Sequence, residues 1–324
     1  MKAAVINALG QPPVYADFPD PQPTGAGTVA TVKAAALKNL DRALVSGSHY
    51  GSAKIPLPSV AGVDGVAALG DGRLVYTSAV PPYGMMAERT LIDPSKAVEL
   101  PARIDPVLAA AVPNPGLSAW MSLEHNAGVR PGQHVLVLGA TGVTGALAVQ
   151  LAKLVFNVGR VVVVGRNPER LEWLLGVGAD EVIQLGTDDL GDRIGAAHRA
   201  QPFDVVLDYL WGEPAEQVLA VLSNSSLGAQ FHATRYVEVG QMAGPTITLA
   251  AGVLRSAGIV LTGFGLDTVP ADVLARVGTD YLPRLFALAA AGELQLVTQQ
   301  RPLSEVGDTW TGREPSGTRV VFIP

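Results

Sequence analysis

Glycine and threonine residues between 139 and 145 are the part of this chain whose spacing points most directly to chemistry. The apolar run Val135–Leu138 stops at the letters GATGVTG, residues 139–145, and a pattern with helical apolar spacing follows. Such a turn presents backbone N–H groups and a helix N-terminus to a pyrophosphate. Gly142 lets the backbone approach the diphosphate, and Gly145 lets the helix pack tightly on the strand. The predicted contacts of this loop are Gly139, Thr141, Gly142, Val143, Thr144 and Gly145.

A second apolar run, Val161–Val164, precedes the residues expected to read the ribose of a dinucleotide. It ends in Gly165, Arg166 and Asn167, about 20 residues after the glycine turn, as a dinucleotide site requires. Sites specific for NAD usually place a carboxylate here, whereas a guanidinium suits a 2′-phosphate. We therefore expect Arg166, Asn167 and Arg170 to bind the cofactor, and NADPH to be preferred over NADH. The alternative is that both arginines are solvated surface charges.

Composition narrows the class of protein. The 324 residues suggest about two domains. A formal net charge of −6 without a basic block argues against nucleic acid as a partner. The chain has no cysteine, so disulfides and thiolate metal sites are excluded. Because no signal peptide or apolar run of about 18 residues is evident, we expect a cytoplasmic protein without a membrane partner.

The chain changes character near residue 118. Residues 1–115 carry short apolar runs broken by Gly and Pro, which indicates a mostly β domain. From about 118 to 258 strand and helix patterns alternate, which predicts a parallel sheet with helices on both faces. The strands expected there are Val135–Leu138, Val161–Val164, Glu181–Gln184, Val205–Leu207 and Ala229–Ala233, with Ile259–Gly263 as a sixth.

Several further motifs occur in a fixed order around the glycine loop. They are ALKNLD at 36–41, Gly47-Ser48-His49-Tyr50, the segment Pro58 to Gly65, Ser118-Ala119-Trp120, Arg130-Pro131-Gly132 and Gly176-Val177-Gly178-Ala179-Asp180. Collinearly over nearly the whole chain, they resemble the medium-chain dehydrogenase/reductase superfamily, and specifically its zinc-free quinone oxidoreductase-like branch.

This resemblance implies an α/β fold with two domains. A Rossmann doubly wound parallel sheet would occupy residues 118–258, and a GroES-like, mostly β catalytic domain would be split between residues 1–117 and 259–324. The cofactor would cross the carboxyl ends of the parallel strands, with its nicotinamide in a cleft between the domains. The further cofactor contacts that we expect are Asp208, His232, Ala233, Phe264, Gly265 and Asn114. For His232 we expect packing or hydrogen bonding rather than base catalysis, and the superfamily suggests a homodimer formed by paired sheet edges.

The resemblance also bears on metal and reaction. The zinc ligands of related alcohol dehydrogenases align with Lys38, Val63 and Asn114, which together form no plausible zinc site. We therefore predict a metal-free enzyme that transfers hydride from NADPH to a quinone or an α,β-unsaturated carbonyl, in which negative charge spreads onto a distant oxygen. The alternatives are an enoyl-thioester or 2-alkenal reductase, and a non-catalytic NADPH-binding redox sensor.

Two residues are candidates for the catalytic hydrogen-bond donor to that oxygen. Lys38 stands where zinc-free relatives usually carry Asn, and it could donate a proton if burial lowered its pKa, or it could point into solvent. Tyr50 lies in the loop that resembles the cleft wall, where it could donate or simply form part of the wall. We expect Asp41 to brace its loop.

Overall fold

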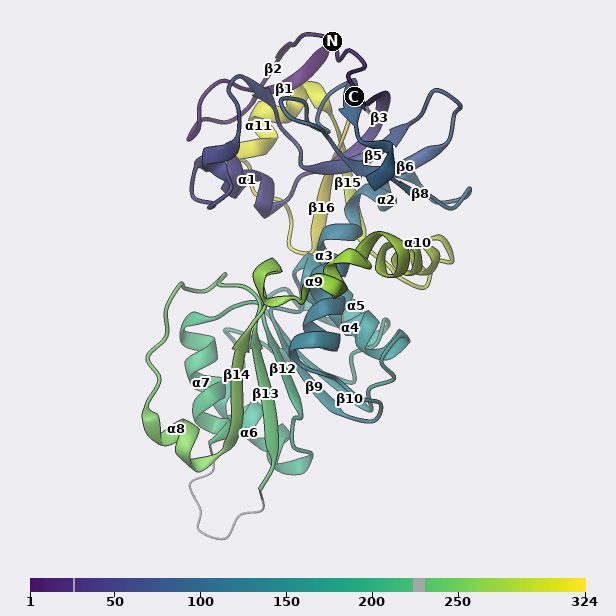
Figure 1. The fold of residues 1–324 in the computed structure, drawn as a ribbon. Helices are drawn as coiled ribbons and strands as arrows, with labels where there is room; N and C mark the ends of the chain where they lie inside the picture. Colours follow the sequence, from purple (N-terminus) through teal and green to yellow (C-terminus); the bar gives the residue numbers. More distant parts are fainter. Residues whose placement is uncertain (26, 224–230) are drawn as a thin grey trace. The chain divides into compact units, whose positions relative to one another are not determined.

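The computed structural model of this chain describes residues 1–25, 27–223 and 231–324 (Figure 1). The chain forms two compact units, of which unit 1 comprises Met1–Asn114 with Ala275–Pro324, and unit 2 comprises Pro115–Leu274. These limits differ from the predicted domain boundaries after residues 117 and 258. The difference at the second boundary arises because strand β14 (Gly258–Gly263) pairs with the sheet of unit 2.

Unit 2 contains the doubly wound parallel sheet that the sequence predicts. Its described residues form six strands in the order β11-β10-β9-β12-β13-β14, and every neighbouring pair is parallel. Besides β14, the strands are β9 (His134–Leu138), β10 (Arg160–Gly165), β11 (Glu181–Gln184), β12 (Val205–Asp208) and β13 (Ala233–Glu238). The strand order reverses between β9 and β12, and open α/β sheets bind ligands at the carboxyl ends of the strands at such a point.

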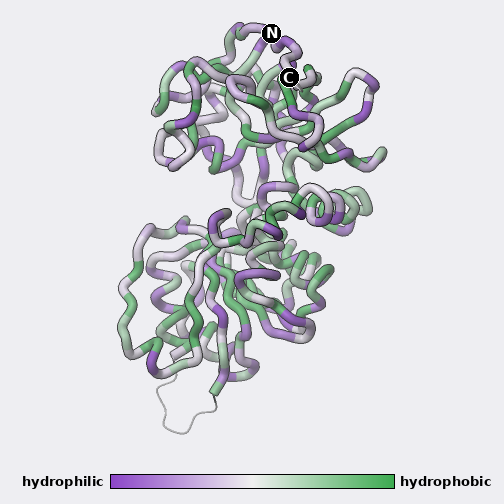
Figure 2. The backbone as a smooth tube through the Cα atoms, in the orientation of Figure 1, coloured by the Kyte–Doolittle hydropathy of each residue, from purple (hydrophilic) through white to green (hydrophobic). Residues whose placement is uncertain are grey.

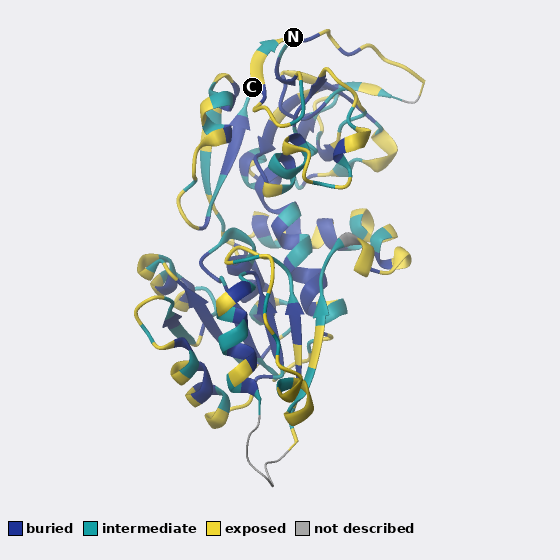
Figure 3. Ribbon diagram, turned by 90° about the vertical axis from the view of Figure 1, so that its left-hand side faces the viewer, coloured by how far each residue is buried: buried dark blue, intermediate teal, exposed yellow. Residues whose placement is uncertain are grey.

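Helices cover both faces of this sheet. The described helices of this part of the chain are α3 (Pro113–Met121), which continues as a π-helix through Ser122–Asn126, then α4 (Val143–Leu154), α5 (Pro168–Leu175), α6 (Leu190–Ala200), α7 (Gly212–Leu222), α8 (Ala251–Ser256) and α9 (Ala271–Ala275). Of these, α4, α5, α6 and α7 pack against its strands. Leu136, Leu138 and Val162 belong to a buried cluster with side chains of α6 and α7. The central strands are apolar on both faces because helices bury both (Figures 2 and 3).

The fifth strand of the sheet differs from its prediction. We expected Ala229–Ala233, but β13 begins at Ala233 and ends at Glu238; residues 229 and 230 lie outside the described residues. Arg235 interrupts the apolar pattern of β13, while Tyr236 and Val237 are buried. A search for an uninterrupted apolar run therefore misplaces this strand.

Unit 1 is built from two mostly antiparallel sheets. A small sheet has the order β2-β1-β4, with β1 (Lys2–Ile6), β2 (Val14–Asp17) and β4 (Ser59–Val60). In the larger sheet, the described strands follow the order β15-β16-β3-β5-β6-β8, with β7 on β3. These strands are β3 (Thr28–Ala36), β5 (Asp64–Ala68), β6 (Leu74–Ser78), β7 (Arg89–Ile92), β8 (Val98–Glu99), β15 (Val297–Pro302) and β16 (Thr318–Ile323).

Helices of unit 1 complete the fold. They are α1 (Asn39–Ser46), α2 (Pro106–Ala111), α10 (Leu282–Ala290), which follows a π-helix at Val277–Tyr281, and α11 (Val306–Thr311). Short 3-10 turns lie at Ser52–Lys54 (η1), Pro94–Lys96, Leu266–Thr268 and Leu303–Glu305, of which Leu266–Thr268 belongs to unit 2.

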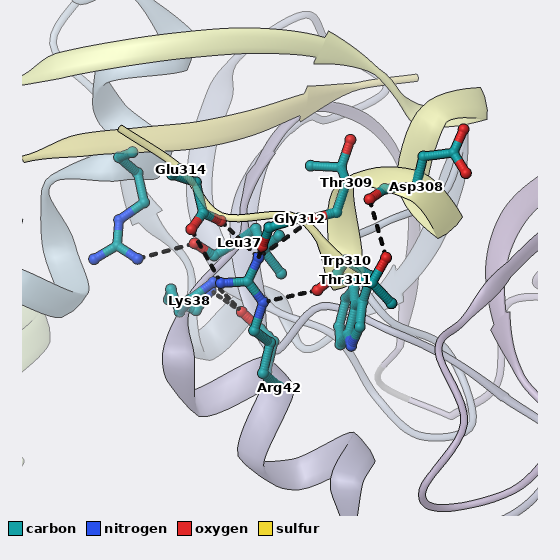
Figure 4. A network of polar contacts seen from close by, with 11 residues as sticks. Leu37, Lys38, Arg42, Asp308, Thr309, Trp310, Thr311, Gly312 and Glu314 are labelled. Carbon is teal, nitrogen blue, oxygen red and sulfur yellow. Dashed lines mark hydrogen bonds and ion pairs between the residues drawn. The ribbon is translucent and has the colours of Figure 1, made fainter. Parts of the chain in front are cut away.

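Polar contacts join the two chain segments of unit 1 (Figure 4). Arg42 of α1 donates from Nε to the Trp310 carbonyl at 3.1 Å, and its two terminal nitrogens reach the Glu314 carboxylate at 2.7 and 3.1 Å. Arg319 donates to the Leu37 carbonyl at 2.9 Å. Together with the pairing of β16 on β3, these contacts hold the last fifty residues against the N-terminal strands.

Candidate functional site

The glycine loop of unit 2 has a backbone that requires glycine at two positions. Gly139 has a φ of +79°, which side-chain-bearing residues rarely adopt. A Cβ atom on Gly145 would lie 2.6 Å from the Gly139 carbonyl oxygen. The first turn of α4 therefore packs directly against the backbone of the loop that precedes it, as the sequence predicted.

The N-terminus of α4 has unused backbone donors, which is the property that suits an anion. Gly142 is the N-cap, and no side chain in the described part of the chain caps the helix there. The N–H groups of the first turn, from Val143 and Thr144 onward, thus lack intrahelical partners and carry the positive end of the helix dipole. Thr141 is buried against Gly165, where a Cβ atom would overlap its methyl group. The carboxyl ends of β9 and β10 are therefore packed together.

The residues after β10 differ sharply in their surroundings. Arg166 is exposed, and Asn167 caps α5 by accepting a hydrogen bond from the Arg170 N–H at 3.1 Å. The Arg170 guanidinium lies 4.0 Å from the centre of the Trp173 ring. Its Nε and Nη2 are buried without a hydrogen-bond partner among the described residues, and burial lowers the pKa of this guanidinium. A buried cation with unused donors fits an anionic ligand group.

A strained turn follows β12 at the point where the strand order reverses. Trp211 has a φ of +56° and a ψ of −158°, a region that costs a non-glycine residue about 1–3 kcal/mol. Asp208 holds the turn, because its Oδ1 accepts from the N–H groups of Leu210 at 2.7 Å and Trp211 at 3.0 Å. Its Oδ2 accepts from the Tyr236 hydroxyl at 2.6 Å. Asp208 thereby shapes the turn beside the glycine loop, where Leu210 closely approaches Gly139.

The expectation that His232 and Ala233 lie at the cofactor edge is wrong. His232 precedes β13, so it lies at the amino ends of the parallel strands, opposite the glycine loop. Its Nε2 is 3.0 Å from the Phe203 carbonyl oxygen and 3.5 Å from Asp204 Oδ1, both of which precede β12. The error follows directly from the misplaced fifth strand. This contact with Phe203 links the segments that precede β12 and β13, so His232 has a structural role there.

The observed position of β13 places Glu238 at the carboxyl edge of the sheet, and the sequence analysis did not identify this residue. Glu238 ends the strand, and its carbonyl accepts from the Phe264 N–H at 2.7 Å. Burial, followed by the nearby Asp208 charge, raises the pKa of the Glu238 carboxyl. Phe264 and Gly265 follow β14 at this same edge, as expected. Asn114 is half-buried and ends the first of the two chain segments that form unit 1.

In unit 1, Lys38 is buried in an ion-pair cluster rather than free to act as a donor. Its side chain is 1% exposed. Nζ lies 2.9 Å from Asp64 Oδ1, 3.4 Å from Asp41 Oδ2 and 3.2 Å from the Ala36 carbonyl oxygen. Burial alone would lower the pKa of Lys38, but the charges of Asp41 and Asp64 outweigh it and leave the pKa raised. Lys38 therefore does not point into solvent, and the condition under which it could donate a proton, a pKa lowered by burial, is not met because of the two carboxylates.

Two further candidates near Lys38 have different environments. Asp41 braces its loop as expected, because its carboxylate accepts from the backbone N–H groups of Lys38 at 2.9 Å and Val63 at 3.0 Å. Tyr50 is 74% exposed, and its ring lies 4.1 Å from that of His49. Tyr50 is thus open to solvent, whereas Lys38 is buried.

Known proteins share both the sequence pattern and the fold. A protein of Emericella nidulans named "Probable NADPH-dependent quinone reductase" is 25% identical, and the match covers 100% of both chains. The quinone oxidoreductase of Thermus thermophilus, solved alone and with NADPH, superimposes with a TM-score of 0.80 at 28% identity over 100% of both chains. These matches support a quinone-oxidoreductase-like protein of the medium-chain dehydrogenase/reductase superfamily. The chain is accordingly an oxidoreductase.

Two further matches describe this oxidoreductase. Residues 143–267 match the family model described as "Zinc-binding dehydrogenase". Lys38, Val63 and Asn114, which align with the zinc ligands of related alcohol dehydrogenases, lie outside that segment. The 2-methylene-furan-3-one reductase of Solanum lycopersicum is 33% identical over 138 residues, which cover 42% of this chain and 34% of the plant protein.

In residues 1–25, 27–223 and 231–324, no group of three or more His, Cys, Asp and Glu side chains is arranged to hold a metal ion. None of the helices in that part of the chain has the length and apolar character needed to cross a bilayer.

Proposed function

We propose that this oxidoreductase binds NADPH at the carboxyl edge of the unit 2 sheet and reduces a quinone or an α,β-unsaturated carbonyl without zinc. The glycine loop supports a dinucleotide, and the names of the Emericella and Thermus proteins support NADPH and a quinone. The name of the tomato protein supports an enone as an alternative acceptor. The observation that carries the choice of NADPH is the Arg170 side chain, whose Nε and Nη2 are buried without a hydrogen-bond partner among the described residues.

The residues present fit a 2′-phosphorylated dinucleotide. Gly142, Val143 and Thr144 would offer N–H groups to the diphosphate, and Arg170 would pair with the 2′-phosphate, with exposed Arg166 adding charge. When bound, the cofactor supplies the hydride. The protein's own contribution is to bind and orient the reactants.

Cofactor affinity tests the role of Arg170. We expect Arg170→Ala to weaken NADPH binding by about 10- to 100-fold, as expected for a lost charge-assisted hydrogen bond. NADH binding should change by less than about twofold, because it lacks the 2′-phosphate. Arg255→Ala, at an exposed arginine on α8, is the matched control, and calorimetric titration provides the dissociation constants. Equal losses for NADPH and NADH in Arg170→Ala would remove Arg170 from this role.

Turnover tests the reaction class. Oxidation of NADPH by the protein should accelerate with quinones or enones, and it should persist after dialysis against a strong chelator. Enoyl-thioesters belong in the same panel, because an enoyl-thioester reductase is the rival enzyme. Tight NADPH binding without turnover on any acceptor would instead identify a redox sensor.

We also propose that two chains pair through β14. This strand ends the described sheet order, and its Val260 and Leu261 side chains are 49% and 36% exposed. An open edge with apolar residues is a template for pairing with another strand. Light scattering should show a dimer, and Val260→Lys should dissociate it. A monomeric wild-type protein would contradict this proposal.

A further inference from the structure

The π-helix that follows α3 ends at an amide side chain, that of Asn126. In this segment the Ala127 N–H donates to the Ser122 carbonyl at 2.8 Å, five residues back. The extra residue in such a turn rotates the side chains after it by about 100° relative to a continuous α-helix. The direction of the Asn126 side chain is therefore set by this wide turn, and turns of this kind often occur at functional sites.

Asn126 donates two hydrogen bonds to the segment that follows β14. Its Nδ2 donates to the Gly263 carbonyl at 2.8 Å and to Thr268 Oγ1 at 3.4 Å. A carbonyl can only accept, so the Gly263 contact fixes which end of the amide faces this segment. The amide oxygen is buried without a hydrogen-bond partner among the described residues, which is unfavourable. The two bonds are thus present even though they leave an acceptor unsatisfied.

Thr268 holds the same segment from its other end. Its Oγ1 accepts from the Gly265 N–H at 3.0 Å and donates to the Gly265 carbonyl at 2.8 Å. The Phe264 N–H donates to the Glu238 carbonyl of β13 at 2.7 Å. Residues 263–265 are therefore held by hydrogen bonds from the π-helix, from β13 and from Thr268, all of which belong to unit 2.

The segment held in this way borders open space. A Cβ atom on Gly265 would have no heavy atom of the described chain within 4 Å apart from its sequence neighbours, and Gly265 is not among the glycines with a positive φ. Neither packing against the described residues nor backbone conformation therefore requires glycine here. The segment follows β14, across the reversal of strand order from the glycine loop and Arg170. A dinucleotide that crosses this reversal places its second half on that side.

We propose that Asn126 is a positioning residue for the nicotinamide end of NADPH. This inference rests on the proposed binding of NADPH by unit 2. The glycine loop and Arg170 would bind the diphosphate and the 2′-phosphate, which leaves the nicotinamide half for the edge beside β14. By fixing residues 263–265, Asn126 keeps the wall of that space in one conformation, so the hydride donor keeps one orientation. Loss of Asn126 should therefore affect nicotinamide order and turnover more than affinity.

Amide hydrogen exchange of the cofactor-free protein tests the contact itself. Asn126→Ala should raise the exchange rates of the Phe264 and Gly265 amides by about three- to tenfold, which is the effect of one neutral hydrogen bond. Asn126→Asp should do the same, because a carboxylate of the same shape has no N–H to donate. Glu124→Ala is the matched control. It removes the hydrogen bond that Trp120 Nε1 donates at 3.0 Å to Glu124 in the same π-helix, and it should leave both amides unchanged.

Bound NADPH then reports on the nicotinamide. Its fluorescence anisotropy decay should show a more mobile ring in Asn126→Ala, while the dissociation constant changes by less than about twofold. With a quinone acceptor, kcat should fall by about three- to tenfold at an unchanged KM for NADPH. Thr268→Val should behave like Asn126→Ala, and Thr268→Ser should behave like the wild type, because it keeps the hydroxyl. Thr268 is exposed, so its variants provide the same test should Asn126→Ala not fold.

The outcomes separate this role from the proposed function. Unchanged amide exchange in Asn126→Ala would overturn the inference. Faster exchange without a change in nicotinamide mobility or kcat would show a structural contact alone and would also overturn it, and both results leave NADPH-dependent reduction intact. A more mobile nicotinamide in Asn126→Ala, with no turnover on any acceptor even in the wild type, would support the positioning role and contradict the proposed reaction. A wild-type protein that binds no NADPH would contradict both.

Discussion

Replacing Lys38 with methionine removes a buried positive charge while retaining most of the side-chain volume. The ammonium lies 2.9 Å from Asp64 and 3.4 Å from Asp41, and the Lys38 and Asp41 side chains are almost completely buried. Removing one member of a buried ion pair typically costs about 3–5 kcal/mol, because the remaining charge has no partner. We expect Lys38→Met to lower the free energy of unfolding by about this amount, a large part of the roughly 5–15 kcal/mol that stabilises a typical domain.

The pH dependence of stability gives this prediction a second readout. Burial lowers the pKa of Lys38, but Asp41 and Asp64 outweigh it and leave the folded-state pKa above the ordinary value of 10.5. The folded protein therefore holds this proton more tightly than the unfolded chain does. The resulting stabilisation is complete below pH 10.5 and is lost as the pH rises through the folded-state pKa. Lys38→Met should lack this alkaline loss.

Urea unfolding followed by circular dichroism measures both effects. Lys33→Met is the control, because Lys33 is an exposed lysine on β3, five residues before Lys38. Adding Asp41→Asn to Lys38→Met should restore part of the lost stability, since it removes a carboxylate left without its cation. An unchanged urea midpoint in Lys38→Met, combined with a large fall in turnover, would refute this reasoning and restore the proton-donor hypothesis for Lys38.

Three further substitutions test the environments of individual residues in unit 2. Gly145→Ala should weaken NADPH binding by at least about tenfold in titration, because its Cβ would lie 2.6 Å from the Gly139 carbonyl oxygen. Burial, then the charges of His232 and Arg199, lowers the pKa of His198 to about 4, so stability falls as the pH drops from 6.5 to about 4; His198→Gln should lose that acid dependence in urea titrations. Tyr236→Phe should cost about 1.5–3 kcal/mol in thermal unfolding, because a charged acceptor loses its donor.

Local patterns were sufficient to predict the glycine loop and most of the parallel sheet. The turn requires glycine where the backbone leaves the allowed region for other residues, as at Gly139, or where two backbones touch, as at Gly145. Both requirements are met within seven consecutive residues, so the sequence displays them directly. The central strands were equally evident, because burial on both faces leaves continuous apolar runs such as Val161–Val164.

Strand limits and long-range partners were not predictable in the same way. The sequence analysis placed the fifth strand too early, because Arg235 lies within β13, and this error moved His232 to the wrong end of the sheet. The environment of Lys38 depends on Asp64, which is 26 residues away in the sequence and belongs to β5. A pairing of this kind is set by the fold of unit 1, so the lysine alone could not reveal whether its pKa rises or falls.

The roles proposed for two cations of this protein, structural for Lys38 and ligand-binding for Arg170, follow from their hydrogen bonds. Lys38 is surrounded by two carboxylates and a carbonyl, so its charge is already satisfied within the fold. Arg170 lies against Trp173 with two buried nitrogens that no described residue uses. An unsatisfied buried donor is unfavourable in the free protein. An anion that accepts hydrogen bonds from these two nitrogens therefore binds more tightly, because their desolvation has already occurred on folding. Substitution of Lys38 should therefore change stability before affinity, and substitution of Arg170 should change affinity before stability.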